Sequence, residues 1–122
     1  MTILMYLNEN EFNKKERALR RYFKKSYKYM MFKLMPTLKK DGKKEGKYEI
    51  ELPTDEIFKK VYGPIKVLFT VTNDVVVLED IIPDEFLMKC FERNLPIYKG
   101  IPYYNEKDLK KIKIVERLIN GN

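Results

Sequence analysis

Apolar residues occur along this chain either in short runs or alternation, which is typical of strands, or at spacings of three and four residues, which is typical of helices. Residues 2–7, Thr-Ile-Leu-Met-Tyr-Leu, are almost uniformly apolar and predict a short buried strand. Asn8 follows, with Glu11 three residues later, which is the spacing of a capping box at a helix N-terminus. We expect a helix from there to about Met35, where Pro36 ends it.

Within this predicted helix the apolar and basic side chains fall on opposite sides when each residue is rotated by about 100°. The apolar side consists of Phe12, Leu19, Phe23, Met30 and Leu34. The basic side consists of Lys14, Arg17, Arg21, Lys24 and Lys28, at spacings of three and four residues. We therefore expect one side to pack on a core and the other to form a long cationic ridge.

The rest of the chain predicts shorter elements. In order, these are a mobile basic connection (37–47), a strand (48–52), a short helix that Thr54 caps and Gly63 ends, a hairpin (65–72 and 75–78) around Asn73-Asp74, a helix (84–93), an irregular or edge segment (95–104) and a last helix (105–119). Helices and strands alternate irregularly and include a hairpin. The pattern indicates one α+β domain over residues 1–122, with a small, largely antiparallel sheet, a long basic N-terminal helix and a C-terminal helix.

Charge changes this picture because it is spread unevenly. The chain has a net charge of +7. Residues 14–47 hold 14 lysines and arginines against three carboxylates, a local balance of +11, whereas the rest of the chain has a balance of −4. A field concentrated in this way favours a polyanion or an acidic protein surface as partner.

Several catalytic chemistries are excluded by residues that the chain lacks. It contains no histidine, one serine (Ser26) and one cysteine (Cys90), and its five glycines form no phosphate-binding loop. Serine or cysteine nucleophiles activated by histidine, and zinc sites built on histidine or four cysteines, are therefore ruled out. We expect a protein without enzymatic activity, cofactor or metal. The single cysteine and the absence of a long apolar run predict a cytoplasmic protein outside the membrane.

Three further groups of residues have both a functional and a structural interpretation. The carboxylates of Glu79, Asp80, Asp84 and Glu85 could hold a divalent cation, but Asp84 and Glu85 also suit the first turn of a helix, and we favour the helix. Cys90 lies on an apolar helical side and is expected in the core. Tyr98, Tyr103 and Tyr104 suit either an interface or a sheet edge, and we favour the sheet edge.

Two functions remain open. The first is nucleic-acid binding, in which Lys14, Arg17, Arg21, Lys24 and Lys28 contact phosphates and the neighbouring Tyr22, Tyr27 and Tyr29 stack on bases or pack beside sugars. The second is a protein-interaction module, such as an inhibitor or adaptor encoded by a mobile element, that docks on a larger protein. Salt dependence separates the two, because phosphate contacts weaken steeply with salt and apolar interfaces do not.

Overall fold

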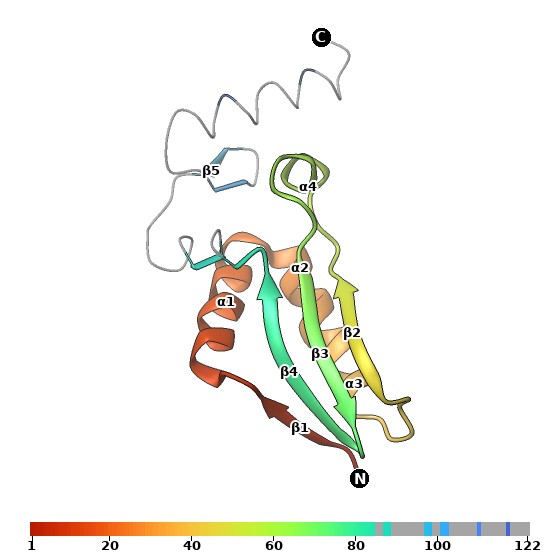
Figure 1. Cartoon of the computed structure of the whole chain (residues 1–122). Helices are drawn as coiled ribbons and strands as arrows, with labels where there is room; N and C mark the ends of the chain where they lie inside the picture. Colours follow the sequence, from red (N-terminus) through yellow and green to blue (C-terminus); the bar gives the residue numbers. More distant parts are fainter. Residues whose placement is uncertain (85–86, 89–96, 99–100, 103–109, 111–116, 118–122) are drawn as a thin grey trace.

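The computed structural model describes residues 1–84, 87–88, 97–98, 101–102, 110 and 117 (Figure 1). Its main sheet has four strands in the order β1-β4-β3-β2, and helices α1, α2 and α3 cover one face of it (Figure 1). The elements are β1 (Ile3–Tyr6), α1 (Glu9–Tyr22), α2 (Lys24–Tyr29), the π-helix η1 (Met30–Leu34), α3 (Met35–Leu38), β2 (Gly46–Glu51), α4 (Glu56–Tyr62), β3 (Lys66–Thr72), β4 (Val75–Ile82), β5 (Ile97–Tyr98) and β6 (Ile101–Pro102). The predicted α+β class is confirmed.

The β3–β4 hairpin lies at the centre of the sheet and was correctly predicted. Asn73 and Asp74 both adopt positive φ, 47° and 63°, which allows a two-residue turn between antiparallel strands. β2 pairs antiparallel to β3, while β1 pairs parallel to β4, so the sheet is mixed. β4 also continues four residues beyond the predicted end of the hairpin, to Ile82.

A β-bulge explains how β4 can be longer than its hydrophobic pattern suggests. Leu68 pairs with Asp80 and Phe69 with Leu78, so Glu79 is the extra residue. Uninterrupted alternation would have placed Asp80 on the core side after Leu78. The bulge brings the fully buried Ile81 there instead.

The predicted long helix over residues 8–35 is wrong in two respects. Its N-terminus is confirmed, because the Asn8 side chain accepts a hydrogen bond from the backbone N–H of Glu11 at 3.1 Å. However, the helix breaks at Phe23, whose φ of −131° and ψ of 61° are not helical. The Phe23 ring packs edge-on against Phe58 of α4 with centroids 4.9 Å apart, and this contact accounts for the interruption.

Pro36 does not end the helical segment, which continues to Leu38. A proline removes one backbone N–H and normally clashes with the preceding turn. Here the turn before it is the π-helix η1, whose wider turn accommodates the ring. The Thr37 hydroxyl also donates to the Lys33 carbonyl at 2.8 Å, so that this carbonyl has a partner.

The core lies between the helices and the sheet. Leu19 of α1 and Met30 of η1 are fully buried there, with Val67 of β3 and Leu78 of β4. Leu19 and Met30 were predicted on the apolar side of the helical segment. The predicted mobile connection is shorter than 37–47, because α3 includes Leu38 and β2 begins at Gly46.

β1 is an edge strand, and the expectation of a fully buried strand is wrong. Leu4 and Tyr6 pack partly against the core, while Ile3 and Met5 are 52% and 51% exposed. The reason is that helices cover only one face of the sheet, so alternate side chains of an edge strand remain in solvent.

The short helix was predicted correctly, but its N-cap was not. α4 begins at Glu56, and the Asp55 carbonyl accepts from the Lys59 N–H at 2.9 Å. The Thr54 hydroxyl donates instead to the Leu52 carbonyl at 2.8 Å. Gly63 ends the helix as expected, with φ of +89°.

The C-terminal expectations fall mostly outside the described residues. Asp84, Leu87 and Met88 are helical, which agrees with a helix starting at Asp84. Lys110 and Arg117 are helical within the predicted range 105–119. Cys90, Tyr103 and Tyr104 are not among the described residues.

Candidate nucleic-acid interface

The outer side of the helical layer carries a group of exposed cations, which we call the basic helical surface. It consists of Arg17, Arg20, Arg21, Lys24, Lys25, Lys28 and Lys33. Lys14, which was predicted on the same ridge, is half-buried. The break at Phe23 divides the predicted ridge residues between α1 and α2, so they do not lie along one straight helix.

No carboxylate of the sequence lies within this segment, since neither aspartate nor glutamate occurs between Glu16 and Asp41. Asp41 is engaged elsewhere, because its carboxylate accepts a hydrogen bond from the Thr2 hydroxyl at 2.7 Å. Apart from Arg21, the cations of the basic helical surface form no ion pair with any described residue. The positive field of this surface is therefore largely uncompensated.

Glu16 borders the surface and is half-buried. Burial raises the pKa of the Glu16 carboxyl, and the positive charges of Arg20 and Arg17 oppose that shift. Ionisation of Glu16 is therefore less favourable in the folded protein than in the unfolded chain.

The aromatic residues differ in how far they reach solvent. Tyr22 is buried, and the Arg21 guanidinium lies 5.4 Å from the centroid of its ring. Tyr27 is half-buried and packs against the core. Tyr29 and Phe32, in contrast, are 39% and 72% exposed. Of the predicted stacking residues, the structure thus leaves Tyr29 accessible, and it adds Phe32, which the sequence had not singled out.

Phe32 lies on the side of the helical segment that is opposite its buried residues. Met30 and Leu34 of η1 are buried, and the two residues on the opposite side of this turn, Phe32 and Lys33, reach solvent. Phe32 is two positions away from both Met30 and Leu34. An apolar stripe that contains those two residues therefore cannot contain Phe32, either in a regular helix or in this turn.

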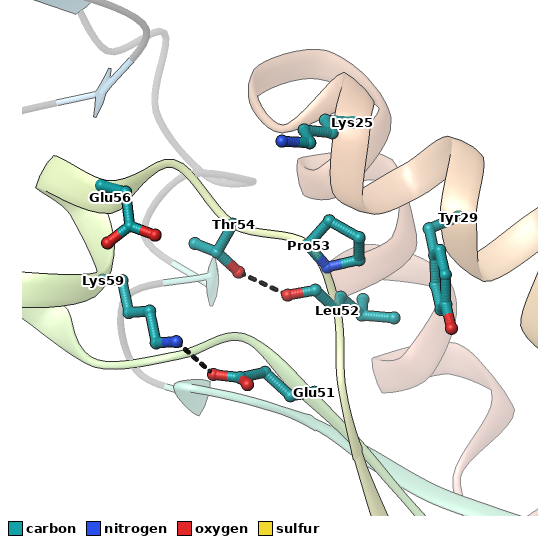
Figure 2. Close-up of a pocket in the computed structure, with 8 residues that line it drawn as sticks. All are labelled: Lys25, Tyr29, Glu51, Leu52, Pro53, Thr54, Glu56 and Lys59. Atoms are coloured by element: carbon teal, nitrogen blue, oxygen red, sulfur yellow. Dashed lines mark hydrogen bonds and ion pairs between the residues drawn. The ribbon is translucent and has the colours of Figure 1, made fainter.

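A polar cavity of about 350 Å³ opens beside Tyr29 (Figure 2). Its lining residues come from α2, from the connection between β2 and α4, and from α4: Lys25, Tyr29, Glu51, Leu52, Pro53, Thr54, Glu56 and Lys59. The Lys59 ammonium pairs with the Glu51 carboxylate at 3.0 Å. The cavity therefore offers cations, carboxylates and one aromatic ring.

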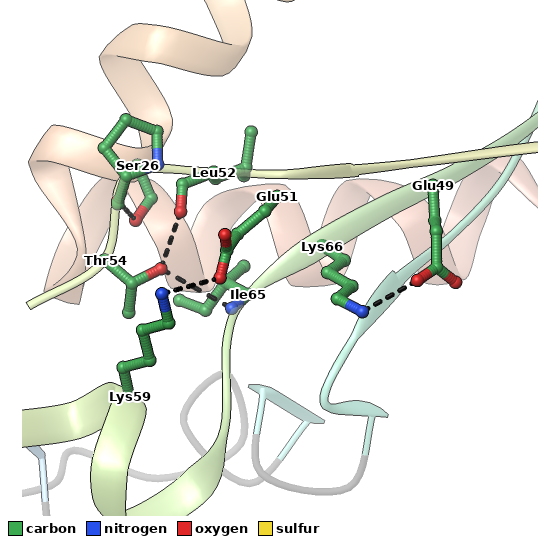
Figure 3. A network of polar contacts seen from close by, with 9 residues as sticks. Ser26, Glu49, Glu51, Leu52, Thr54, Lys59, Ile65 and Lys66 are labelled. Atoms are coloured by element: carbon green, nitrogen blue, oxygen red, sulfur yellow. Dashed lines mark hydrogen bonds and ion pairs between the residues drawn. The ribbon is translucent and has the colours of Figure 1, made fainter. Parts of the chain in front are cut away.

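Hydrogen bonds fix the wall of this cavity (Figure 3). The Ser26 hydroxyl donates to the Pro53 carbonyl at 2.5 Å, which ties α2 to the connection after β2. The Leu52 N–H donates to the Ile65 carbonyl at 2.8 Å, which ties the same connection to the start of β3. Ser26 therefore has a structural role, since it connects α2 to the segment that carries Pro53.

One lysine of α1 is buried and was missed by the sequence analysis. Lys15 is 1% exposed, and its ammonium pairs with the carboxylates of Asp80 and Asp84. Burial alone lowers the pKa of Lys15, but the hydrogen bonds and charges of these two carboxylates outweigh it and raise that pKa above its usual value. A signal existed in the sequence, because Phe12, Lys15, Leu19 and Tyr22 follow one another at spacings of three and four residues.

The acidic cluster therefore has partners within the chain. Asp80 and Asp84 accept from Lys15, and the Glu79 carboxylate accepts from the Thr70 hydroxyl. Glu85 is not among the described residues. Within the described part of the chain, no three His, Cys, Asp or Glu side chains gather as a metal-binding group.

None of the helices in the described residues has the length and apolar character needed to cross a bilayer. Comparison of the chain with protein-family models, with curated proteins and with solved structures gives no match.

Proposed function

We propose that this protein binds nucleic acid through the basic helical surface and has no catalytic step of its own. The observation that supports the proposal most is the set of exposed cations on α1, α2 and η1 with no carboxylate between Glu16 and Asp41. Lysines and arginines arranged in this way neutralise phosphates and release counterions, which gives affinity for any polyanion.

A salt titration of a labelled oligonucleotide, followed by fluorescence anisotropy, tests this proposal. The logarithm of the affinity should fall linearly with the logarithm of salt concentration, with a slope of about −0.9 per neutralised phosphate on duplex. A binding curve that does not change with salt would contradict it. The oligonucleotide should stay intact, and metal-dependent cleavage that is lost in Asp80→Ala would contradict the non-catalytic part.

A triple variant locates the contact. Replacing Arg17, Lys24 and Lys28 by glutamine should weaken binding about tenfold or more and make the salt slope shallower. The melting temperature should stay the same, because the three residues are exposed and form no ion pair with a described residue.

The matched control replaces three other exposed lysines by glutamine, Lys44, Lys47 and Lys60, none of which forms an ion pair with a described residue. It changes the net charge equally but leaves the basic helical surface intact. An equal loss of affinity in the two triple variants would show that net charge alone, rather than this surface, attracts the oligonucleotide.

A second function, docking on a protein, is favoured by the edge strand β1. Its exposed side chains Ile3 and Met5, with the neighbouring Leu7 at 68% exposure, form an apolar row on an uncharged strand. An edge strand of this kind can pair with an extended segment of another protein. Such a complex should depend little on salt and should be lost in Met5→Lys.

For localisation, we propose the cytoplasm, on the ground that the single cysteine suits a reducing compartment. Cell fractionation followed by immunoblotting tests this.

A further inference from the structure

We propose that Tyr29 and Phe32 form a platform on which unpaired bases stack, so that the basic helical surface prefers single-stranded nucleic acid. This inference rests on the proposed function and specifies its ligand. Phe32 is 72% exposed, and among the large apolar residues described only Met1 is more exposed. Leaving a phenylalanine ring in water forgoes the free energy of burying it.

The two rings lie three positions apart, at the end of α2 and in the π-helical turn η1, and both reach solvent. Lysines surround them at helical spacing: Lys25 precedes Tyr29 by four positions, Lys28 precedes Phe32 by four, and Lys33 follows Tyr29 by four. All three lysines are exposed. An aromatic face beside cations suits a base and its phosphates, because every base has a π-face and every nucleotide carries a negative charge.

Duplex nucleic acid cannot use this platform, because its bases are stacked on one another and only the backbone and groove edges are accessible. A duplex would contact the lysines alone. The aromatic residues therefore add affinity only for strands whose bases are free to leave their own stack.

An anionic membrane is a weaker match than a single strand. A helix that binds a membrane surface turns a wide apolar side outward. Here Met30, Leu34 and Leu38 are buried on the sheet, and the outward side offers two rings among lysines. The charge suits the membrane, but the outward apolar area does not.

The polar cavity beside Tyr29 extends the platform (Figure 2). Its volume of about 350 Å³ is near the lower end of the roughly 300–1,000 Å³ typical of small-molecule sites. Lys25 and Glu56 line it and offer a donor and an acceptor. A base that leaves its stack beside Tyr29 thus meets groups that can bond to its polar edge.

The test compares three labelled probes of one length by fluorescence anisotropy: a single strand of mixed sequence, the same strand with abasic sites, and the duplex. The full-length protein should bind the single strand at least about fivefold more tightly than the abasic strand, in line with the contribution of one stacked base. Phe32→Ala should remove this preference and leave affinity for the duplex and the abasic strand unchanged. Phe32→Trp should restore it.

Leu68→Ala is the matched control, since it truncates a partly exposed apolar side chain of β3 and should change none of the three affinities. Phe32→Ala should also keep the melting temperature, because the ring is mostly in solvent.

The inference is overturned if Phe32→Ala binds the single strand as the wild type does, or if it weakens single strand and duplex equally. It is also overturned if Phe32 is needed for sedimentation with phosphatidylserine vesicles but not for oligonucleotide binding. A wild type that binds duplex with a steep salt slope but has no preference for free bases leaves the proposed function intact. A wild type that binds none of the probes overturns both.

Discussion

The two outer sides of this protein hold their charges in different ways. On the sheet side the Lys66 ammonium pairs with the Glu49 carboxylate at 2.7 Å, across neighbouring strands. On the helical side Arg17, Lys24 and Lys28 are exposed without an ion pair to a described residue. Cations that are paired within the chain serve the fold. Repulsion among unpaired cations disfavours the fold slightly, and they are available to a partner.

α1 shows the same contrast within one helix. Lys15 is buried and held by two carboxylates, while Arg17, two positions later, is exposed. Residue type therefore says little about the role of a lysine or arginine here. Its position relative to the apolar stripe decides whether it stabilises the core or faces solvent.

The largest expected effect comes from a substitution in the core beneath the basic helical surface. Leu19→Ala truncates a fully buried side chain of α1 and should destabilise the protein by about 2–5 kcal/mol, measured by urea unfolding. Nucleic-acid affinity should persist at temperatures where the variant is folded. If the Leu19→Ala variant is fully folded but no longer binds, the claim that the buried side of α1 serves only the fold is wrong.

The next effect concerns the buried cation. Lys15→Met keeps the apolar stem but removes the charge, so Asp80 and Asp84 lose their partner. Since Asp84 is 61% exposed, solvent can take over part of that role, and we expect a loss of about 1–3 kcal/mol at pH 7. Equal stability of Lys15→Met and wild type would show that the ion pairs contribute nothing net.

The pH dependence of the same variant provides a second readout. The raised pKa of Lys15 in the folded state means that its contribution is fully present below the unfolded value of about 10.5. It is lost as pH rises through the folded value. The stability difference between wild type and Lys15→Met should therefore shrink in alkaline solution, as followed by thermal unfolding at stepwise higher pH. A constant difference would contradict the assignment of the charge to Lys15.

The predictable parts of the fold were those determined by neighbouring residues. Asn8 caps α1 through the N–H of Glu11, and Asn73-Asp74 form a turn at positive φ. Both depend on side chains or backbone angles within three or four positions. Gly63 ends α4 for the same kind of local reason.

The parts that could not be predicted depend on distant contacts. The break at Phe23 follows from its packing against Phe58, 35 positions later in the chain, and the apolar spacing gives no sign of it. Of the basic residues that the spacing predicted on the ridge, only Lys14 is not exposed, while the exposed Arg20, Lys25 and Lys33 were not singled out.

The smallest expected effect concerns Glu16, the carboxylate that borders the basic helical surface. Burial raises the pKa of Glu16, so its charged form is unfavourable in the folded state, and this cost appears as pH rises through the folded pKa. Glu16→Gln should therefore be slightly more stable at pH 7, by about 0.5 kcal/mol or less. It also removes a negative charge beside Arg17 and Arg20, which should tighten oligonucleotide binding by about two- to threefold at low salt.

Glu9→Gln makes the same change in net charge on the first turn of the same helix, about two turns away, and is the matched control. Because the field of one exposed charge falls off within a Debye length of about 10 Å at 0.1 M salt, Glu9→Gln should affect binding less than Glu16→Gln does. The difference between the two variants should vanish at high salt, where both charges are screened. If both variants tighten binding equally at low salt, the oligonucleotide responds to the total charge of the protein and not to the unpaired cations around Glu16. The difference between paired cations on the sheet side and unpaired cations on the helical side would then not explain binding.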